Sequence, residues 1–119
     1  MKIGDNVILE KSVEFSLSII SYCEELESKR KYVIANQLLK SGTSIGANIH
    51  EAQNAESKAD FIHKMKLAAK ELEETKYWLL LCKKSQNYPD SSELGNLANE
   101  IGRILFKIIA SSKKKSTHF

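Results

Sequence analysis

Residues 41–52 read Ser-Gly-Thr-Ser-Ile-Gly-Ala-Asn-Ile-His-Glu-Ala, and this stretch says most about how the chain folds. It lies within a longer pattern of helical spacing, yet small and polar residues stand where a simple bundle would carry leucine. Two glycines inside a helix cost about 1 kcal/mol each relative to alanine, so another interaction must compensate. We favour close packing of a second helix against Gly42 and Gly46 over a kink, because the segment contains no proline.

Apolar residues at three- and four-residue spacing predict four helices, at about residues 5–28, 32–55, 57–85 and 90–111. Ser57 is a suitable N-cap for the third helix, with Asp60 three residues later as in a capping box. The turn sequence of residues 87–90 separates the third helix from the fourth. Short connections and the absence of a strand pattern predict an all-α fold, an antiparallel up-down-up-down four-helix bundle forming one domain over residues 1–119.

Each predicted helix carries an apolar stripe that we expect to face the core, whereas the lysine-rich tail from residue 113 is expected to fray. The core positions expected from spacing are Ile8, Phe15, Ile19, Tyr22 and Leu26; Ile34, Leu38, Ser41, Ile45, Asn48 and Ala52; Phe61, Met65, Ala68, Leu72, Thr75, Leu79 and Cys82; and Leu94, Leu97, Ile101, Ile104 and Ile108.

The composition is that of a small globular protein. The 119 residues are 42% hydrophobic and 28% charged, and the longest apolar runs are far too short to cross a bilayer. The first residues also lack the basic, apolar and small-residue succession of a signal peptide. We therefore expect a soluble, cytoplasmic protein with no membrane partner.

The residues that could carry chemistry do not form a recognisable catalytic or metal-binding set. Asp60 and His63 make one carboxylate-x-x-His pair, and His50 stands beside Glu51, which is too little for a di-iron bundle. Neither arginine precedes a histidine by the four to six residues of RNA-cleaving bundles. We predict no enzymatic activity, no metal and no cofactor, and we expect the two cysteines to be reduced, buried thiols rather than a disulfide.

The third helix carries more apolar residues than one buried face requires. A second stripe, about a third of a turn from the core stripe, includes Leu67, Trp78 and Leu81, and residues 77–82 are apolar all the way round. We predict that these three residues lie in a subunit interface. The alternative is a wide buried face on a central helix.

Polar residues of the second helix share one face at four-three spacing, namely Ser44, Asn48 and Glu51. They could form a polar pocket, or a buried hydrogen-bonding strip that fixes the packing of helices or subunits. A buried glutamate would need a partner such as lysine or arginine. We favour the structural interpretation.

Residues 41–52, together with residues 57–65 and 70–79, resemble the bacterial 23S rRNA-intervening sequence proteins, some of which are encoded within insertions in 23S rRNA genes. The most specific part is Ser44, Ile45, Asn48, Ile49 and Glu51. The resemblance implies a small cytoplasmic bundle that assembles into a ring-like homopentamer, and most members have no established activity. A related branch, the accessory proteins of diversity-generating retroelements, is strongly basic and is thought to bind nucleic acid and a reverse transcriptase.

Positive charge gathers in the second half of this chain. Residues 1–56 carry a net −2 and residues 57–119 a net +5, which together give +3. The basic residues that we predict to contact nucleic acid are Lys66, Lys70, Lys83, Lys84, Arg103, Lys107, Lys113, Lys114 and Lys115. Two hypotheses follow: an oligomer that binds RNA or a nucleic-acid-binding protein, and a protein-interaction scaffold with no nucleic-acid role.

Overall fold

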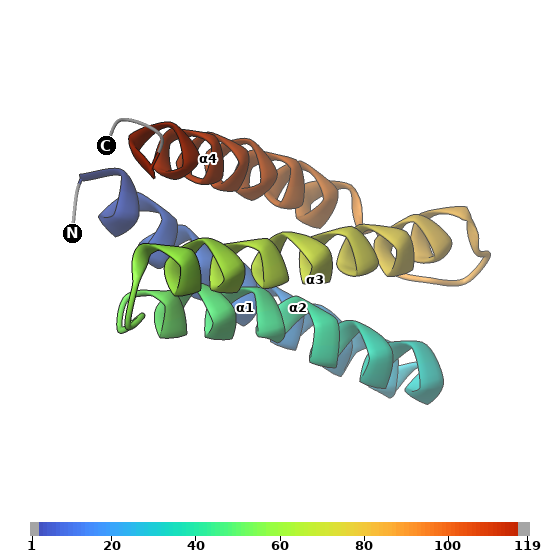
Figure 1. Cartoon of the computed structure of the whole chain (residues 1–119). Coiled ribbons are helices and arrows are strands. Elements are labelled where there is room, and N and C mark those ends of the chain that lie inside the picture. The colour runs from blue at the N-terminus through green and yellow to red at the C-terminus, as the bar shows by residue number, and fades with distance from the viewer. Residues whose placement is uncertain (1–2, 117–119) are drawn as a thin grey trace.

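The computed structural model describes the backbone of residues 3–116 and the side chains of residues 7–114. These residues form the helices α1 (Ile3–Ser28), α2 (Tyr32–Ala52), α3 (Lys58–Lys84) and α4 (Ser92–Ser116). Each helix runs opposite to the one before it, as an antiparallel bundle requires (Figure 1). The predicted all-α four-helix fold is confirmed.

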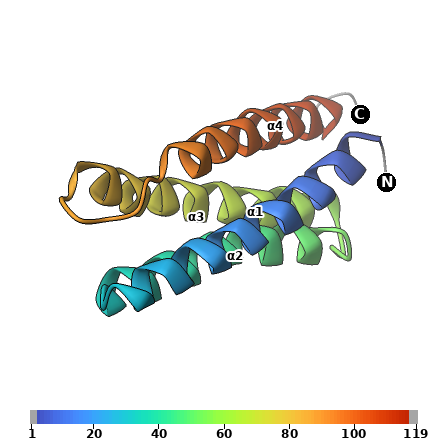
Figure 2. The same ribbon diagram turned by 180° about the vertical axis from the view of Figure 1, so that it is seen from behind.

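The helices are arranged in chain order around the bundle. α2 packs between α1 and α3, and α4 packs against α3 and α1, whereas no Cα of one helix lies within 8 Å of a Cα of its diagonal partner in the described residues. Seen from behind, α1 lies along α2 at one end and approaches α4 at the other (Figure 2). The molecule measures 54 × 21 × 20 Å, and no described helix has the length and apolarity needed to span a membrane.

The core follows the predicted stripes closely in three helices. All seven predicted positions of α3 and all five of α1 are buried, and in α2 only Ile34 and Asn48 remain half-buried. In α4 the buried face is rotated from the predicted one. Ala98 and Leu105 are buried there, together with Leu94 and Ile101, whereas Leu97, Ile104 and Ile108 are half-buried.

Several helix ends differ from the predicted bounds. The Ser57 side chain caps α3 by accepting a hydrogen bond from the Asp60 backbone N–H at 3.0 Å, as expected. α2 ends at Ala52 instead of residue 55, whereas α4 continues to Ser116 instead of residue 111. The backbone of residues 113–116 is helical, contrary to the predicted tail, because lysine is a good helix former and suits the negative end of the helix dipole; residues 117–119 of that tail lie outside the described residues.

Candidate nucleic-acid interface

The two glycines of residues 41–52 bring α1 close to α2. A Cβ atom at Gly42 would lie only 2.8 Å from Ile19 Cγ2, and one at Gly46 would lie 3.2 Å from Ser16 Oγ. α2 runs unbroken through both positions. Close helix packing, and not a kink, therefore explains these glycines.

The polar face of α2 is bonded mainly to its own helix. Ser44 Oγ donates to the Lys40 carbonyl oxygen at 2.6 Å, and Asn48 Nδ2 donates to the Ser44 carbonyl oxygen at 2.9 Å. Glu51 is exposed, contrary to the expected buried strip, and its carboxylate lies 3.2 Å from Lys64 Nζ on α3. These contacts support a structural role and a surface link between α2 and α3.

The buried polar contact between α2 and α3 is formed instead by Ser41 and Thr75. Their hydroxyl oxygens lie 3.0 Å apart, and the Thr75 hydroxyl also lies 2.8 Å from the Glu71 carbonyl oxygen, to which it can donate. The signal in the sequence was a hydroxyl residue in each of two mainly apolar stripes. The pairing itself depends on the register between the helices, which spacing within each helix does not reveal.

The three residues predicted at a subunit interface remain at the surface of the single chain. Leu67 and Trp78 are half-buried and Leu81 is exposed. The Trp78 indole donates to Glu74 Oε2 at 3.1 Å and lies beside the Tyr77 ring, with centroids 5.5 Å apart. This second stripe of α3 is thus not fully covered by the other helices, as an interface would require.

Some of the predicted nucleic-acid contacts converge on a groove between α3 and α4. The groove has a volume of about 500 Å³, and Ala69, Leu72 and Gly102 contribute to its apolar lining. Arg103 and Lys107 line it from α4, and neither is paired with a carboxylate within the described residues. On α3, Lys76 also lines it but lies 3.6 Å from Glu73.

A second pair of cations lies where α3 begins and α4 ends. The neutral amine of Lys66 can accept a hydrogen bond from the Lys113 ammonium, and the Lys113 charge repels a charged Lys66, so both effects lower the pKa of Lys66 below its ordinary value. Lys70 follows Lys66 by one helical turn on α3, on the same side of the helix. An anion bound between Lys66 and Lys113 would relieve their repulsion.

The remaining predicted contacts do not join these groups. Lys83 and Lys84 end α3, about 25 Å along the helix from Lys66. Lys83 lies near Asp90, whose pKa is lowered mainly by hydrogen bonds from Ser92 and also by the Lys83 charge. Lys114 is exposed in the last turns of α4, and the side chain of Lys115 lies outside the described residues.

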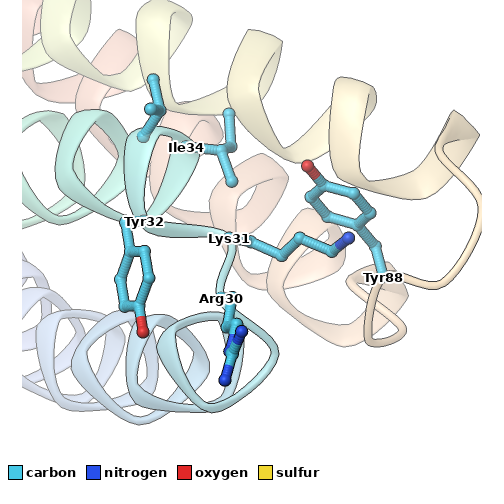
Figure 3. Close-up of a pocket in the computed structure, with 6 residues that line it drawn as sticks. Arg30, Lys31, Tyr32, Ile34 and Tyr88 are labelled. Atoms are coloured by element: carbon cyan, nitrogen blue, oxygen red, sulfur yellow. The ribbon is translucent and has the colours of Figure 1, made fainter.

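A pocket of about 250 Å³ at the far end of the bundle was not predicted (Figure 3). Lys31 reaches toward Tyr88, with its Nζ 5.0 Å from the ring centroid. Arg30 has a φ of 63° and follows the end of α1 at the position where glycine is usual. Because Lys31 and Tyr88 hold the α1–α2 turn against the α3–α4 connection, we interpret this pocket as structural.

The two cysteines are free and buried, as expected. Cys23 lies on α1 and Cys82 on α3, and because no Cα pair of these helices lies within 8 Å, a disulfide would require the backbone to move. Burial raises the pKa of the Cys23 thiol to about 12, and burial also raises the pKa of Cys82.

We predict that neither thiol reacts with Ellman's reagent in the folded protein at pH 8, and that both react after unfolding. Since the folded state retains the Cys23 proton more tightly, this thiol adds stability that is complete below about pH 9 and lost as the pH rises toward 12. The measurement is thiol titration with and without denaturant. Rapid labelling of two thiols per folded chain would contradict the burial of Cys23 and Cys82.

The histidine and carboxylate positions do not assemble a metal centre in the described residues, where no group of three or more His, Cys, Asp or Glu side chains could hold a metal ion. Asp60 instead accepts a hydrogen bond from the Glu56 backbone N–H at 3.1 Å. His63 and His50 are both exposed.

The comparisons with known proteins agree with this architecture. The family model of the 23S rRNA-intervening sequence protein matches residues 4–109. A solved structure from Bacteroides thetaiotaomicron, described as a protein with unknown function from the S23 ribosomal protein family, is 41% identical with a TM-score of 0.86. The alignment covers 91% of this chain and 99% of that one. Among curated proteins, none matches this chain. Since the family match spans nearly all of the bundle, the chain belongs to the 23S rRNA-intervening sequence protein family.

Proposed function

We propose that this protein is a non-enzymatic, self-associating four-helix bundle of the cytoplasm that binds RNA or a ribonucleoprotein. The observation that carries the proposal is the basic groove between α3 and α4. Arg103 and Lys107 line this groove with no carboxylate partner among the described side chains, and Lys66 and Lys113 repel each other toward the end of α4. Phosphate groups are the ligands that such unpaired cations favour.

Self-association would strengthen weak contacts with a long anionic partner. A single chain has a net charge of +3, so a pentamer, as the family resemblance implies, would carry about +15. Repeated phosphate contacts along one RNA then add through avidity. The polar side chains of α2 bond to their own helix or to α3, which supports a structural and not a catalytic role for them.

Trp78→Glu is expected to lower the mass of the assembly in solution while the helix content stays close to that of the wild type. A carboxylate at this half-buried position would have to lose its water in any subunit contact through α3. Light scattering measures the mass, and far-UV circular dichroism measures the helix content. Val33→Glu is the control, because Val33 is 81% exposed on α2. An unchanged mass for Trp78→Glu and also for Leu81→Glu would place the interface elsewhere.

The RNA proposal is tested by size-exclusion chromatography with light scattering, on the protein alone and mixed with a structured fragment of 23S-type RNA. We expect a mass well above the 13.4 kDa of one chain, and RNA that elutes with the protein at low salt. A monomer that elutes separately from RNA at low salt would contradict both parts of the proposal.

A protein-interaction scaffold without RNA binding is the second candidate, and one observation favours it. The outer side of α1 and α2 carries an apolar groove of about 260 Å³ lined by Val13, Leu17, Gly46 and Ala47, and Leu17 is 61% exposed. Exposed apolar surface of this kind is typical of protein contacts. A single stoichiometric protein recovered with this chain, and still bound after nuclease treatment, would favour the scaffold.

A further inference from the structure

The basic groove between α3 and α4 also carries an aromatic ring that the core does not use. The Phe106 side chain lines the groove and is 75% exposed, although the adjacent Leu105 is buried. Residues of both α3 and α4 line this groove, and the two helices pack against each other, so the ring borders a groove between two helices. Burying a phenyl ring stabilises a protein by about 1.5–3 kcal/mol, and this ring does not contribute that stabilisation in the single chain. A ligand that covers the ring would gain it.

Cations lie on both sides of this ring along α4. Arg103 precedes Phe106 by one helical turn, about 5 Å along the axis, and Lys113 follows it by two turns, about 10 Å. Lys113 is in turn close to Lys66 of α3. Of the described residues that line the groove, Glu73 alone carries a carboxylate, and it is paired with Lys76.

We propose that this groove binds an unpaired segment of RNA, with one base stacked on the Phe106 ring and the neighbouring phosphates held by Arg103 and Lys107 next to the ring and by Lys66 and Lys113 toward the C-terminal end of α4. The inference rests on the proposed function, for which it names the binding site and the kind of RNA.

The geometry favours unpaired nucleotides over a duplex. A base can stack on a protein ring only when its face is free, and in a helical duplex neighbouring bases cover both faces. The Asn99 amide also lines the groove and can donate to and accept from the edge of a base. Together, an aromatic ring, an amide and flanking cations are what proteins use to hold single strands.

The test is fluorescence anisotropy with the native assembly, using a labelled single-stranded oligouridine and a blunt-ended RNA duplex of equal length. Phe106→Ala is expected to weaken single-strand binding about 5- to 150-fold, the usual effect of losing one stacked base, and to leave duplex binding unchanged. Phe106→Trp should retain wild-type affinity. Tyr32→Ala is the matched control, because Tyr32 is an exposed aromatic residue in the pocket at the far end of the bundle.

Salt dependence separates stacking from charge. Lys66→Ala is expected to reduce the slope of log affinity against log salt by about 0.7, the value for one phosphate contact on a single strand. Phe106→Ala should leave this slope at its wild-type value, because the phenyl ring carries no charge and therefore releases no counterions from the RNA phosphates.

The outcomes distinguish this inference from the proposed function. RNA binding that is equal in the wild type and in Phe106→Ala would overturn the groove site and leave the RNA-binding function standing. A lower mass of Phe106→Ala, with RNA affinity unchanged, would make this face a subunit contact and also overturn the site. No RNA binding by the wild type would overturn both.

Discussion

Replacing Lys66 and Lys113 together by glutamate is expected to weaken single-stranded RNA binding about 100-fold at low salt. The double variant removes two phosphate contacts and places two carboxylates where the phosphates would lie. The two lysines lie close together and both are exposed, so the fold should tolerate the change. Fluorescence anisotropy gives the affinity, and thermal unfolding by circular dichroism confirms that the bundle is intact.

The matched control is the double variant Lys83→Glu with Lys84→Glu. It changes the net charge by the same amount, but it acts at the other end of α3, beside Asp90. We expect this variant to lose less than about tenfold in affinity, through the long-range field alone. If the two double variants lose the same affinity, net charge and not the groove governs binding.

Gly42→Ala and Gly95→Ala are expected to change stability in opposite directions, although both replace a helical glycine with alanine. At Gly42 the new Cβ would lie 2.8 Å from Ile19, and such overpacking costs about 1–3 kcal/mol. The gain in helix propensity, roughly 0.5–1 kcal/mol, recovers only part of this cost. We therefore expect a net loss of about 1–2 kcal/mol in the free energy of unfolding.

At Gly95 no neighbouring atom lies within 4 Å of the new Cβ, so only the propensity gain remains, roughly 0.5–1 kcal/mol. Urea unfolding of the two variants and the wild type measures both effects. If Gly42→Ala is at least as stable as the wild type, α1 can move away from α2 with little loss in the free energy of unfolding. The glycine would then need another explanation.

The sequence predicted most of the core because helical spacing alone determines which side chains share a face. In α3 every predicted core position is buried. The exceptions have a common physical cause. Leucine carries a stronger hydrophobic signal than alanine, so spacing selected Leu97 instead of the adjacent Ala98, and it could not indicate that Ser41 would meet Thr75. Both depend on how neighbouring helices approach one another.

The candidate site was predicted only in part for the same reason. Lysines can be identified in the sequence, but the register between α3 and α4 decides which of them lie together. That register brings Lys66 to Lys113 and leaves Lys83 near Asp90. Phe106 lies beside apolar neighbours in sequence, so its spacing does not distinguish it from a core residue, yet the face that α4 buries leaves its ring exposed.

The most direct measurement of the central claim is the affinity of the wild-type assembly for single-stranded RNA at low and at physiological salt, with duplex DNA as the comparison. We predict tight binding of the RNA at low salt, a clear weakening as salt rises, and weaker binding of the duplex. The absence of RNA binding at low salt, by a protein whose mass shows it to be assembled, would contradict the account and leave the apolar face of α1 and α2 as the surface to explain.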